Sequence, residues 1–175
     1  MRPILIALAF ACTALLSAAE EIAYRPGAVG KEGGSTSQGT RTIVEIPKAG
    51  KVLDVALTGK EWSGTILVWT DFNPALSGND PKRWKHVVIT MRRLGGMDDG
   101  LLLVSPVLKD AKCDKFLKLE TYDPKSNTQR GFAEVVIPLA DFGDLPANVI
   151  GLHFGAMTKD REKTVKVQIA KIAFR

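Results

Sequence analysis

Apolar and polar residues alternate along most of the chain from Thr42 onward. This is the pattern of a strand that turns one face to a core and the other to solvent. Short apolar and β-branched runs are separated by turn-forming residues about every ten positions, and helical periodicity is almost absent. The pattern predicts strands over residues 42–46, 51–58, 64–72, 84–92, 101–104, 115–122, 132–139, 149–156 and 164–174.

Glycine, proline and asparagine punctuate the chain between these runs, as in Lys48-Ala49-Gly50 and in the segment from Gly143 to Pro146. About eight or nine short strands joined by such turns predict an all-β fold, an antiparallel β-sandwich of the jelly-roll type. In the last strand the apolar phase changes after Ile169, which predicts a β-bulge near Ala170 and Lys171. The apolar faces predicted to form the core include Leu53, Val55, Leu57, Val87, Ile89, Met91, Val135, Ile137, Leu152 and Phe154.

The N-terminal segment has a different composition. Residues 1–19 combine Arg2, an apolar run and small residues before Glu20, the pattern of a secretory signal peptide. Residues 20–41 are rich in glycine, serine and threonine and predict a flexible lead-in, with a single domain over 42–175. The protein is therefore expected to be secreted or periplasmic, without a transmembrane anchor.

Charge and cysteine content limit the partners and the disulfide bonds that can be expected. Removing Arg2 from the 24 basic residues leaves 23 against 19 acidic ones, a net charge of +4 without a long basic stripe. Nucleic acid is therefore not an expected partner. Cys113 is the one cysteine after the predicted signal peptide, so no intrachain disulfide is expected, and its role as an apolar residue or a reactive thiol stays open.

The faces predicted to point away from the core carry aromatic and charged side chains together. Aromatic rings stack on the apolar side of a sugar while charged groups hydrogen-bond its hydroxyls, so this mixture favours a glycan-binding face. The candidate ligand-binding residues are Trp69, Trp84, His86, Arg92, Glu120 and Tyr122.

Other interpretations of these residues remain open. Trp69 and Trp84 flank a long polar loop and are either a binding platform or caps on the core. His86 and His153 are each alone in their strands, so no metal site is expected, and no cofactor. The turn from Gly95 to Gly100 contains two aspartates that could bind calcium but lacks the EF-hand pattern.

One stretch carries a family resemblance. The segment Gly131-Phe132-Ala133-Glu134-Val135-Val136-Ile137-Pro138-Leu139, then Ile150-Gly151-Leu152-His153-Phe154 and the closing strand to Phe174, resembles the C-terminal half of carbohydrate-binding β-sandwich modules of the family 9-like and galactose-binding-like groups. The resemblance implies the sandwich fold first and sugar binding second. The common aspartate of the closing strand is replaced around Ala170 and Lys171, which speaks against a calcium site there.

These observations predict an exported, non-catalytic protein that binds a polysaccharide or other glycan. The alternative is an accessory or structural protein of the cell envelope that binds a protein partner through the same face. A glycosidase or lyase is the least favoured interpretation. Glu120 and Glu134 could form a carboxylate pair, but the chain shows no further catalytic constellation, and no catalytic residue is predicted.

Overall fold

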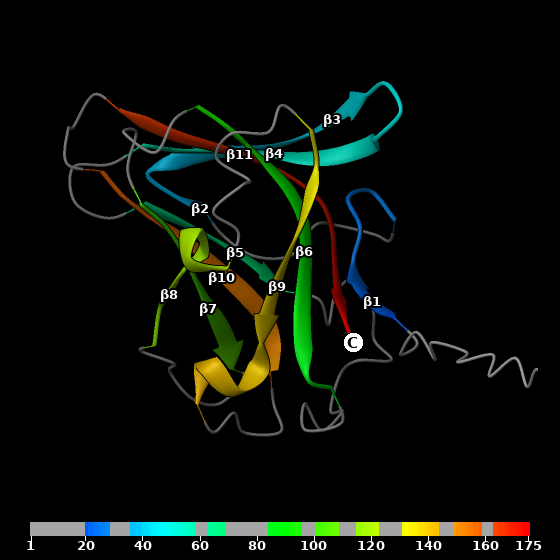
Figure 1. Ribbon diagram of the computed structural model, residues 1–175. Coiled ribbons are helices and arrows are strands. Elements are labelled where there is room, and N and C mark those ends of the chain that lie inside the picture. The colour runs from blue at the N-terminus through cyan, green and yellow to red at the C-terminus, as the bar shows by residue number, and fades with distance from the viewer. Residues whose placement is uncertain are drawn as a thin grey trace, which may run out of the picture.

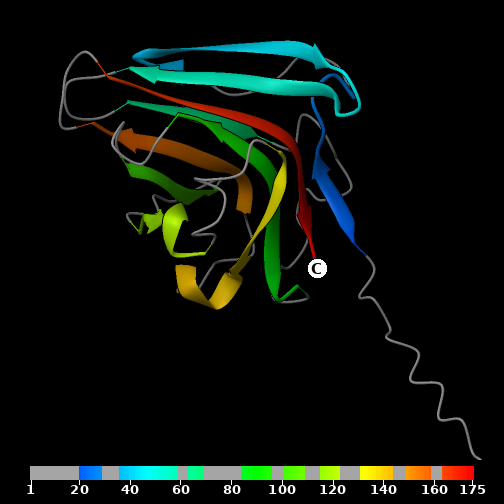
Figure 2. The same ribbon diagram turned by 45° about the horizontal axis from the view of Figure 1, so that its top comes forward.

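The computed structural model describes residues 20–28, 36–58, 63–68, 84–95, 101–108, 115–122, 131–143, 149–158 and 163–175. They form an antiparallel β-sandwich of the jelly-roll type, whose two sheets lie face to face (Figures 1 and 2). The six-stranded sheet contains β1 (Glu21–Tyr24), β3 (Gly39–Ile46), β4 (Gly50–Thr58), β6 (His86–Leu94), β9 (Ala133–Pro138) and β11 (Thr164–Phe174). The five-stranded sheet contains β2 (Thr36–Ser37), β5 (Ser63–Val68), β7 (Leu101–Leu108), β8 (Leu117–Lys118) and β10 (Val149–Met157).

All neighbouring strands in both sheets are antiparallel. The six-stranded sheet has the order β3-β4-β11-β6-β9, with β1 paired to β11 outside this order, and the five-stranded sheet has the order β2-β5-β10-β7-β8. The pairing of β4 with β11 ends at Leu53 opposite Ile169, and β1 takes the place of β4 beside the rest of β11. The tip of the β3–β4 hairpin is therefore released from β11 and extends past it at the edge of the sheet (Figure 1).

The core lies between the sheets and confirms the predicted alternation. Leu53, Val55 and Leu57 of β4 are fully buried, and so are Val87 and Ile89 of β6. Residues from β5, β7 and β10 complete the same apolar cluster from the opposite sheet. At roughly 25 cal/mol per Å² of apolar area removed from water, this cluster is the main stabilising feature of the fold.

The predicted bulge in the last strand is confirmed. The register of β11 against β6 shifts between Ile169 and Lys171, which leaves Ala170 as the additional residue. Because the bulge restores the phase, Ile172 and Phe174 are buried along with Ile169.

The structure also differs from the predicted strands. The run predicted over 115–122 ends as a strand at Lys118 and continues as the 3-10 helix η4 (Leu119–Thr121); a second 3-10 helix, η5 (Leu139–Phe142), follows β9. The lead-in predicted over 20–41 contains β1 and β2, and β3 begins at Gly39. Pairing with β11 explains β1, because this partner is distant in sequence and leaves no local signal.

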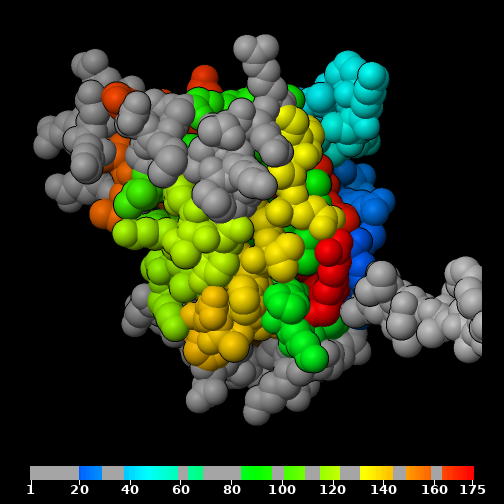
Figure 3. Space-filling view, in the orientation of Figure 1, coloured from blue at the N-terminus to red at the C-terminus, as the bar shows by residue number. Residues whose placement is uncertain are grey.

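The predicted signal peptide and residues 69–72 lie outside the described residues. Within the described part of the chain, no helix is long and apolar enough to cross a membrane. In Figure 3, β9 and η5 form part of the visible surface beside the C-terminal end of β11, with the β3–β4 hairpin above them.

Candidate functional site

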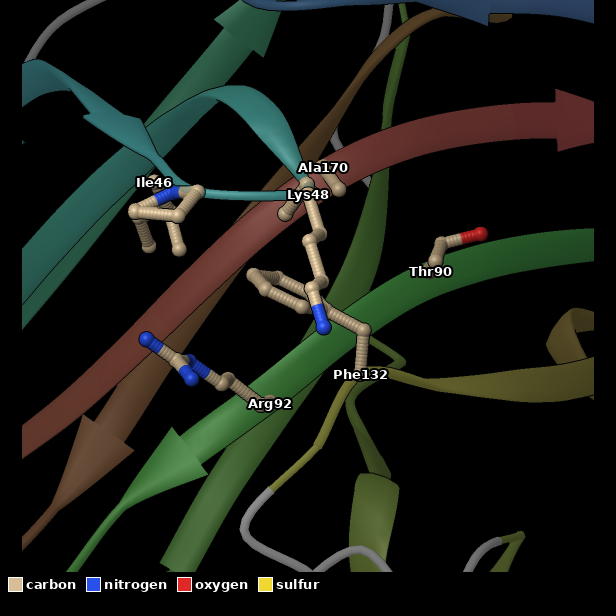
Figure 4. Close-up of a pocket in the computed structure, with 8 residues that line it drawn as sticks. Ile46, Lys48, Thr90, Arg92, Phe132 and Ala170 are labelled. Atoms are coloured by element: carbon tan, nitrogen blue, oxygen red, sulfur yellow. The ribbon is translucent and has the colours of Figure 1, made fainter.

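The outer face of the six-stranded sheet is hollowed beneath the tip of the β3–β4 hairpin. Two adjoining hollows of about 340 and 510 Å³ share Ala49, Thr90 and Ala170, and together they are called the outer groove below. The first hollow is lined by Ile46, Pro47, Lys48, Ala49, Thr90, Arg92, Phe132 and Ala170 (Figure 4). The second hollow is lined by Arg25, Pro26, Ala28, Ala49, Lys51, Thr90, Glu134, Ala170 and Lys171.

The floor of the outer groove is formed by short side chains. Ala170 is the bulged residue of β11, and Thr90 lies on β6 opposite Lys171. The hydroxyl Oγ1 of Thr90 is buried and has no hydrogen-bond partner among the described residues. Buried hydroxyls in proteins are nearly always paired, so this one is a group that water or a ligand hydroxyl can satisfy.

A row of polar side chains holds Arg92 in place at the outer groove. Arg92 Nε donates a hydrogen bond of 2.7 Å to Gln168 Oε1, and Gln168 Nε2 donates one of 2.8 Å to Asp54 Oδ1. These three residues lie side by side on neighbouring strands because Gln168 of β11 pairs with Asp54 of β4 and Arg92 of β6. The row holds the guanidinium in one place while its charge faces the groove.

Phe132 provides the aromatic surface. Its ring centroid lies 4.9 Å from Arg92 Cζ, which is within the range of a cation–π contact. Phe132 directly precedes β9, and its side chain is half-buried. The ring is thus held by Arg92 while part of its surface stays accessible to a ligand.

Lys48 covers the outer groove from the hairpin turn. The Ala49 N–H donates to the Ile46 carbonyl over 3.1 Å, and Lys48 has φ of 69° after Pro47. Proline followed by a residue of positive φ is the pattern of a type II turn, in which glycine is favoured at the second of the two central positions. A lysine there costs of order 1 kcal/mol, yet it extends its amine toward Arg92 and Phe132 (Figure 4).

A network of ion pairs borders the second hollow. Lys171 Nζ lies 2.8 Å from Glu20 Oε2 and 3.8 Å from Glu134 Oε1. Arg175 contacts the same two carboxylates at 3.1 and 3.0 Å. The hydrogen bond from Lys171 lowers the pKa of the Glu20 carboxyl below its usual value. The network joins β9 and β11 to the residue that precedes β1.

Three of the predicted site residues belong to or adjoin β6. Arg92 lines the outer groove, and His86 lies on the same face of β6, six residues and about 20 Å away along the strand. Trp84 packs against the core cluster, with its ring centroid 4.9 Å from that of Phe174. This contact favours the core-cap interpretation of Trp84. Trp69 lies outside the described residues.

Glu120 and Tyr122 do not share a face with Arg92, which corrects the expected grouping. Glu120 accepts hydrogen bonds from Arg93 Nη1 at 2.7 Å and from the Leu102 N–H at 2.9 Å. Tyr122 packs against the core and donates its hydroxyl to Asp141 over 2.9 Å. Burial, with Asp141 beside it, raises the pKa of Tyr122. Both residues follow the point where the strand becomes η4, so strand alternation no longer predicts their direction.

The outer face of the five-stranded sheet has a different character. His153 of β10 lies over Gly64, where an added Cβ would clash with the imidazole Nε2. The ring of Phe116 meets His153 edge-on, with 5.4 Å between the centroids. Burial lowers the pKa of His153. Among the described residues, no group of three histidine, cysteine, aspartate or glutamate side chains could hold a metal ion.

No family model and no curated protein matches the sequence. Solved structures do match. The family 11 carbohydrate-binding module of Clostridium thermocellum, determined with a β-1,3-1,4-mixed-linked tetrasaccharide, is 15% identical, with 89% of this chain and 94% of the module aligned and a TM-score of 0.59. A family 30 carbohydrate-binding module is 12% identical over 90% of this chain and 88% of the module, with a TM-score of 0.61.

The chain has a carbohydrate-binding-module-like β-sandwich. The fold implied by the resemblance of residues 131–174 is thereby confirmed, although these two modules belong to families 11 and 30. A β-1,2-glucanase from Parabacteroides distasonis also matches with a TM-score of 0.65 and 13% identity, over 89% of this chain but 25% of the enzyme. At these identities the likeness shows the fold, and function is argued from the groove.

Several residues of the outer groove were absent from the predicted site. Phe132 and Glu134 follow from alternation, because both lie on the non-core side of their strand. Lys48 could have been noticed from Pro47-Lys48-Ala49-Gly50, a turn with lysine where glycine is expected. Arg25 and Lys51 had no local signal, since they come to the groove through the pairing of β1 with β11 and the bend of the hairpin.

Proposed function

We propose that the protein is an exported, non-catalytic glycan-binding β-sandwich that holds its ligand in the outer groove. Phe132 provides a ring face for the apolar side of a sugar. Arg92 and Thr90 provide hydrogen-bonding groups for its hydroxyls. His86 extends the same face along β6 as a further contact for a longer chain.

The pairing of Phe132 with a fixed polar row is the observation that carries this proposal. The arginine is held at 2.7 Å by Gln168 and lies 4.9 Å from the ring centroid, so aromatic and polar groups are placed before a ligand arrives. Such preorganisation reduces the entropy lost on binding. The hollow of about 340 Å³ lies within the size range of small-ligand sites, and the carbohydrate-binding-module-like fold supports a sugar as the ligand.

A binding role accounts for the acidic groups better than hydrolysis does. Glycosidases generally use two carboxylates that flank the bond to be cleaved. Among the described residues that line the outer groove, Glu134 is the one carboxylate, and Lys171 and Arg175 already pair with it. The groove therefore lacks the pair of acids that this chemistry needs, within the part of the chain that the structure describes.

A panel of immobilised glycans, followed by calorimetry on each glycan that binds, tests the proposal. The informative variant is Phe132→Leu, which keeps apolar bulk but removes the ring face. We expect its affinity to fall by about 1–3 kcal/mol, because aromatic contacts at a binding centre contribute on this scale, while its melting temperature stays near that of the wild type. Phe116→Leu, at a ring that packs against His153 on the outer face of the five-stranded sheet, is the matched control and should bind normally.

Equal affinity of the wild type and Phe132→Leu would show that the ligand does not use the outer groove. Failure of the wild type to bind any glycan on the panel would contradict glycan binding itself. Capture of one envelope protein through the same face, lost in Phe132→Leu, would instead support the alternative function.

A further inference from the structure

Positive charge dominates the outer groove. Among the described residues, five cationic side chains and one carboxylate, Glu134, line its two hollows. Lys171 is neutralised by Glu20 and Glu134. The four other cationic residues are Arg25, Lys48, Lys51 and Arg92.

Three of these four residues have no acidic partner in the described part of the chain. No ion pair between described residues involves Arg25, Lys48 or Lys51. A sugar without charge would leave this excess uncompensated, whereas an anionic ligand would gain from it.

Local geometry keeps the cations around the groove. The stem of Lys51 passes over the turn after β1, since a Cβ at Gly27 would lie 2.9 Å from Lys51 Cδ. The Ala28 N–H closes that turn by donating to the Arg25 carbonyl over 3.2 Å. Lys48 occupies the positive-φ position of the hairpin turn, which disfavours any residue with a Cβ and so marks the lysine as a candidate for a functional role.

We infer that the outer groove recognises an acidic glycan, with Lys48, Lys51 and Arg25 contacting carboxylate or sulfate groups while Phe132 contacts a sugar ring. This inference rests on the proposed function and specifies its ligand class. The charges lie around both hollows, so the ligand that fits them is a chain with anionic groups on successive sugars. Exposed charge pairs are screened by salt, so binding should weaken steeply as ionic strength rises.

Polymers that share a backbone but differ in charge test the inference. Polygalacturonate is compared with its methyl ester, and dextran sulfate with dextran, by affinity electrophoresis and calorimetry at low and at near-physiological salt. We expect each charged polymer to bind at least tenfold more tightly than its neutral counterpart. The two pairs of polymers also distinguish the anionic groups. Tighter binding of polygalacturonate than of its ester identifies carboxylates as the ligand groups, and tighter binding of dextran sulfate than of dextran identifies sulfates.

Lys48→Gly is the decisive variant. It removes the charge and also relieves the strained backbone, so we expect about five- to tenfold weaker binding of the preferred acidic polymer together with an unchanged or higher melting temperature. Lys118→Gln, at an exposed lysine of the five-stranded sheet, is the matched control and should stay within twofold of the wild type.

The outcomes separate this inference from the proposed function. Equal binding of charged and neutral polymers, with loss of both in Phe132→Leu, would overturn the acidic preference and leave glycan binding intact. No binding to any polymer would overturn both. Single-stranded DNA that binds more tightly than every acidic polysaccharide would overturn the glycan class in favour of nucleic acid.

Discussion

Arg92 and Arg93 are adjacent in β6, yet strand alternation sends them to opposite sides of the sheet. Arg92 faces the outer groove, where it meets a neutral amide and an aromatic ring. Arg93 points inward, and its side chain is 3% exposed beside Glu120, whose side chain is 10% exposed. The same residue type thus contributes to a ligand-accessible surface in one position and to an internal ion pair in the next.

The difference lies in what each arginine is paired with. Taking a charge out of water is costly, so Arg93 needs a carboxylate partner, and Glu120 provides it at 2.7 Å. Glu120 also accepts from the Leu102 N–H and thereby ties η4 to β7. Arg92 is half-buried on the outer face, beside Gln168 and Phe132. This contrast assigns Glu120 to the sandwich and Arg92 to the groove.

The largest expected effect on stability comes from breaking the internal ion pair between Arg93 and Glu120. Arg93→Met should lower the free energy of unfolding by about 3–5 kcal/mol, because it leaves the Glu120 carboxylate buried without its counter-charge. Arg92→Met, the matched control on the other face, should cost less than about 1 kcal/mol. Urea denaturation followed by circular dichroism measures both.

A second substitution sharpens this comparison. Arg93→Met combined with Glu120→Gln removes both charges but keeps an oxygen for the Leu102 N–H, so it should recover much of the lost stability. Equal losses for Arg92→Met and Arg93→Met would show that the two arginines do not differ in the way proposed.

A smaller effect, on the pH dependence of stability, is expected from His153 on the outer face of the five-stranded sheet. Burial lowers the pKa of His153, so between its folded and unfolded pKa values the unfolded chain binds more protons. Stability should therefore fall as the pH drops below about 6.5, the ordinary histidine value, and be retained above it. Thermal melts from pH 7.5 to 5 should show a steeper decline for the wild type than for His153→Gln, which has no titrating ring. Parallel pH profiles would contradict a buried neutral imidazole.

Much of the fold could be predicted because its main signals are local. Alternation identified the core faces of β4 and β6, and the phase change after Ile169 located the bulge. Val136, between the buried Val135 and Ile137, is 39% exposed, as strict alternation requires. The strand β1 escaped prediction because its partner β11 lies at the far end of the sequence.

The site was less predictable for a related reason. Arg92 could be placed on an outward face from sequence alone, but a face becomes a groove only where distant segments cover it. The hairpin tip with Lys48 and the turn with Arg25 are such segments. Glu120 and Tyr122 were grouped with Arg92 because a strand was expected through residue 122, whereas η4 turns their side chains toward other partners.

The central claim is that a glycan binds in the outer groove. The most direct test is to titrate an oligosaccharide that binds on the glycan panel into the protein and to follow the backbone amide chemical shifts by NMR. If the outer groove is the site, the largest shifts should fall on Ala49 of the hairpin turn, Thr90 of β6, Phe132 before β9 and Ala170 of β11, which surround one hollow. His153 of the five-stranded sheet and Phe116, whose ring packs against it, should shift little. Large shifts confined to Phe116, His153 and their neighbours, with the groove amides unchanged, would contradict the account and move the binding site to the five-stranded sheet.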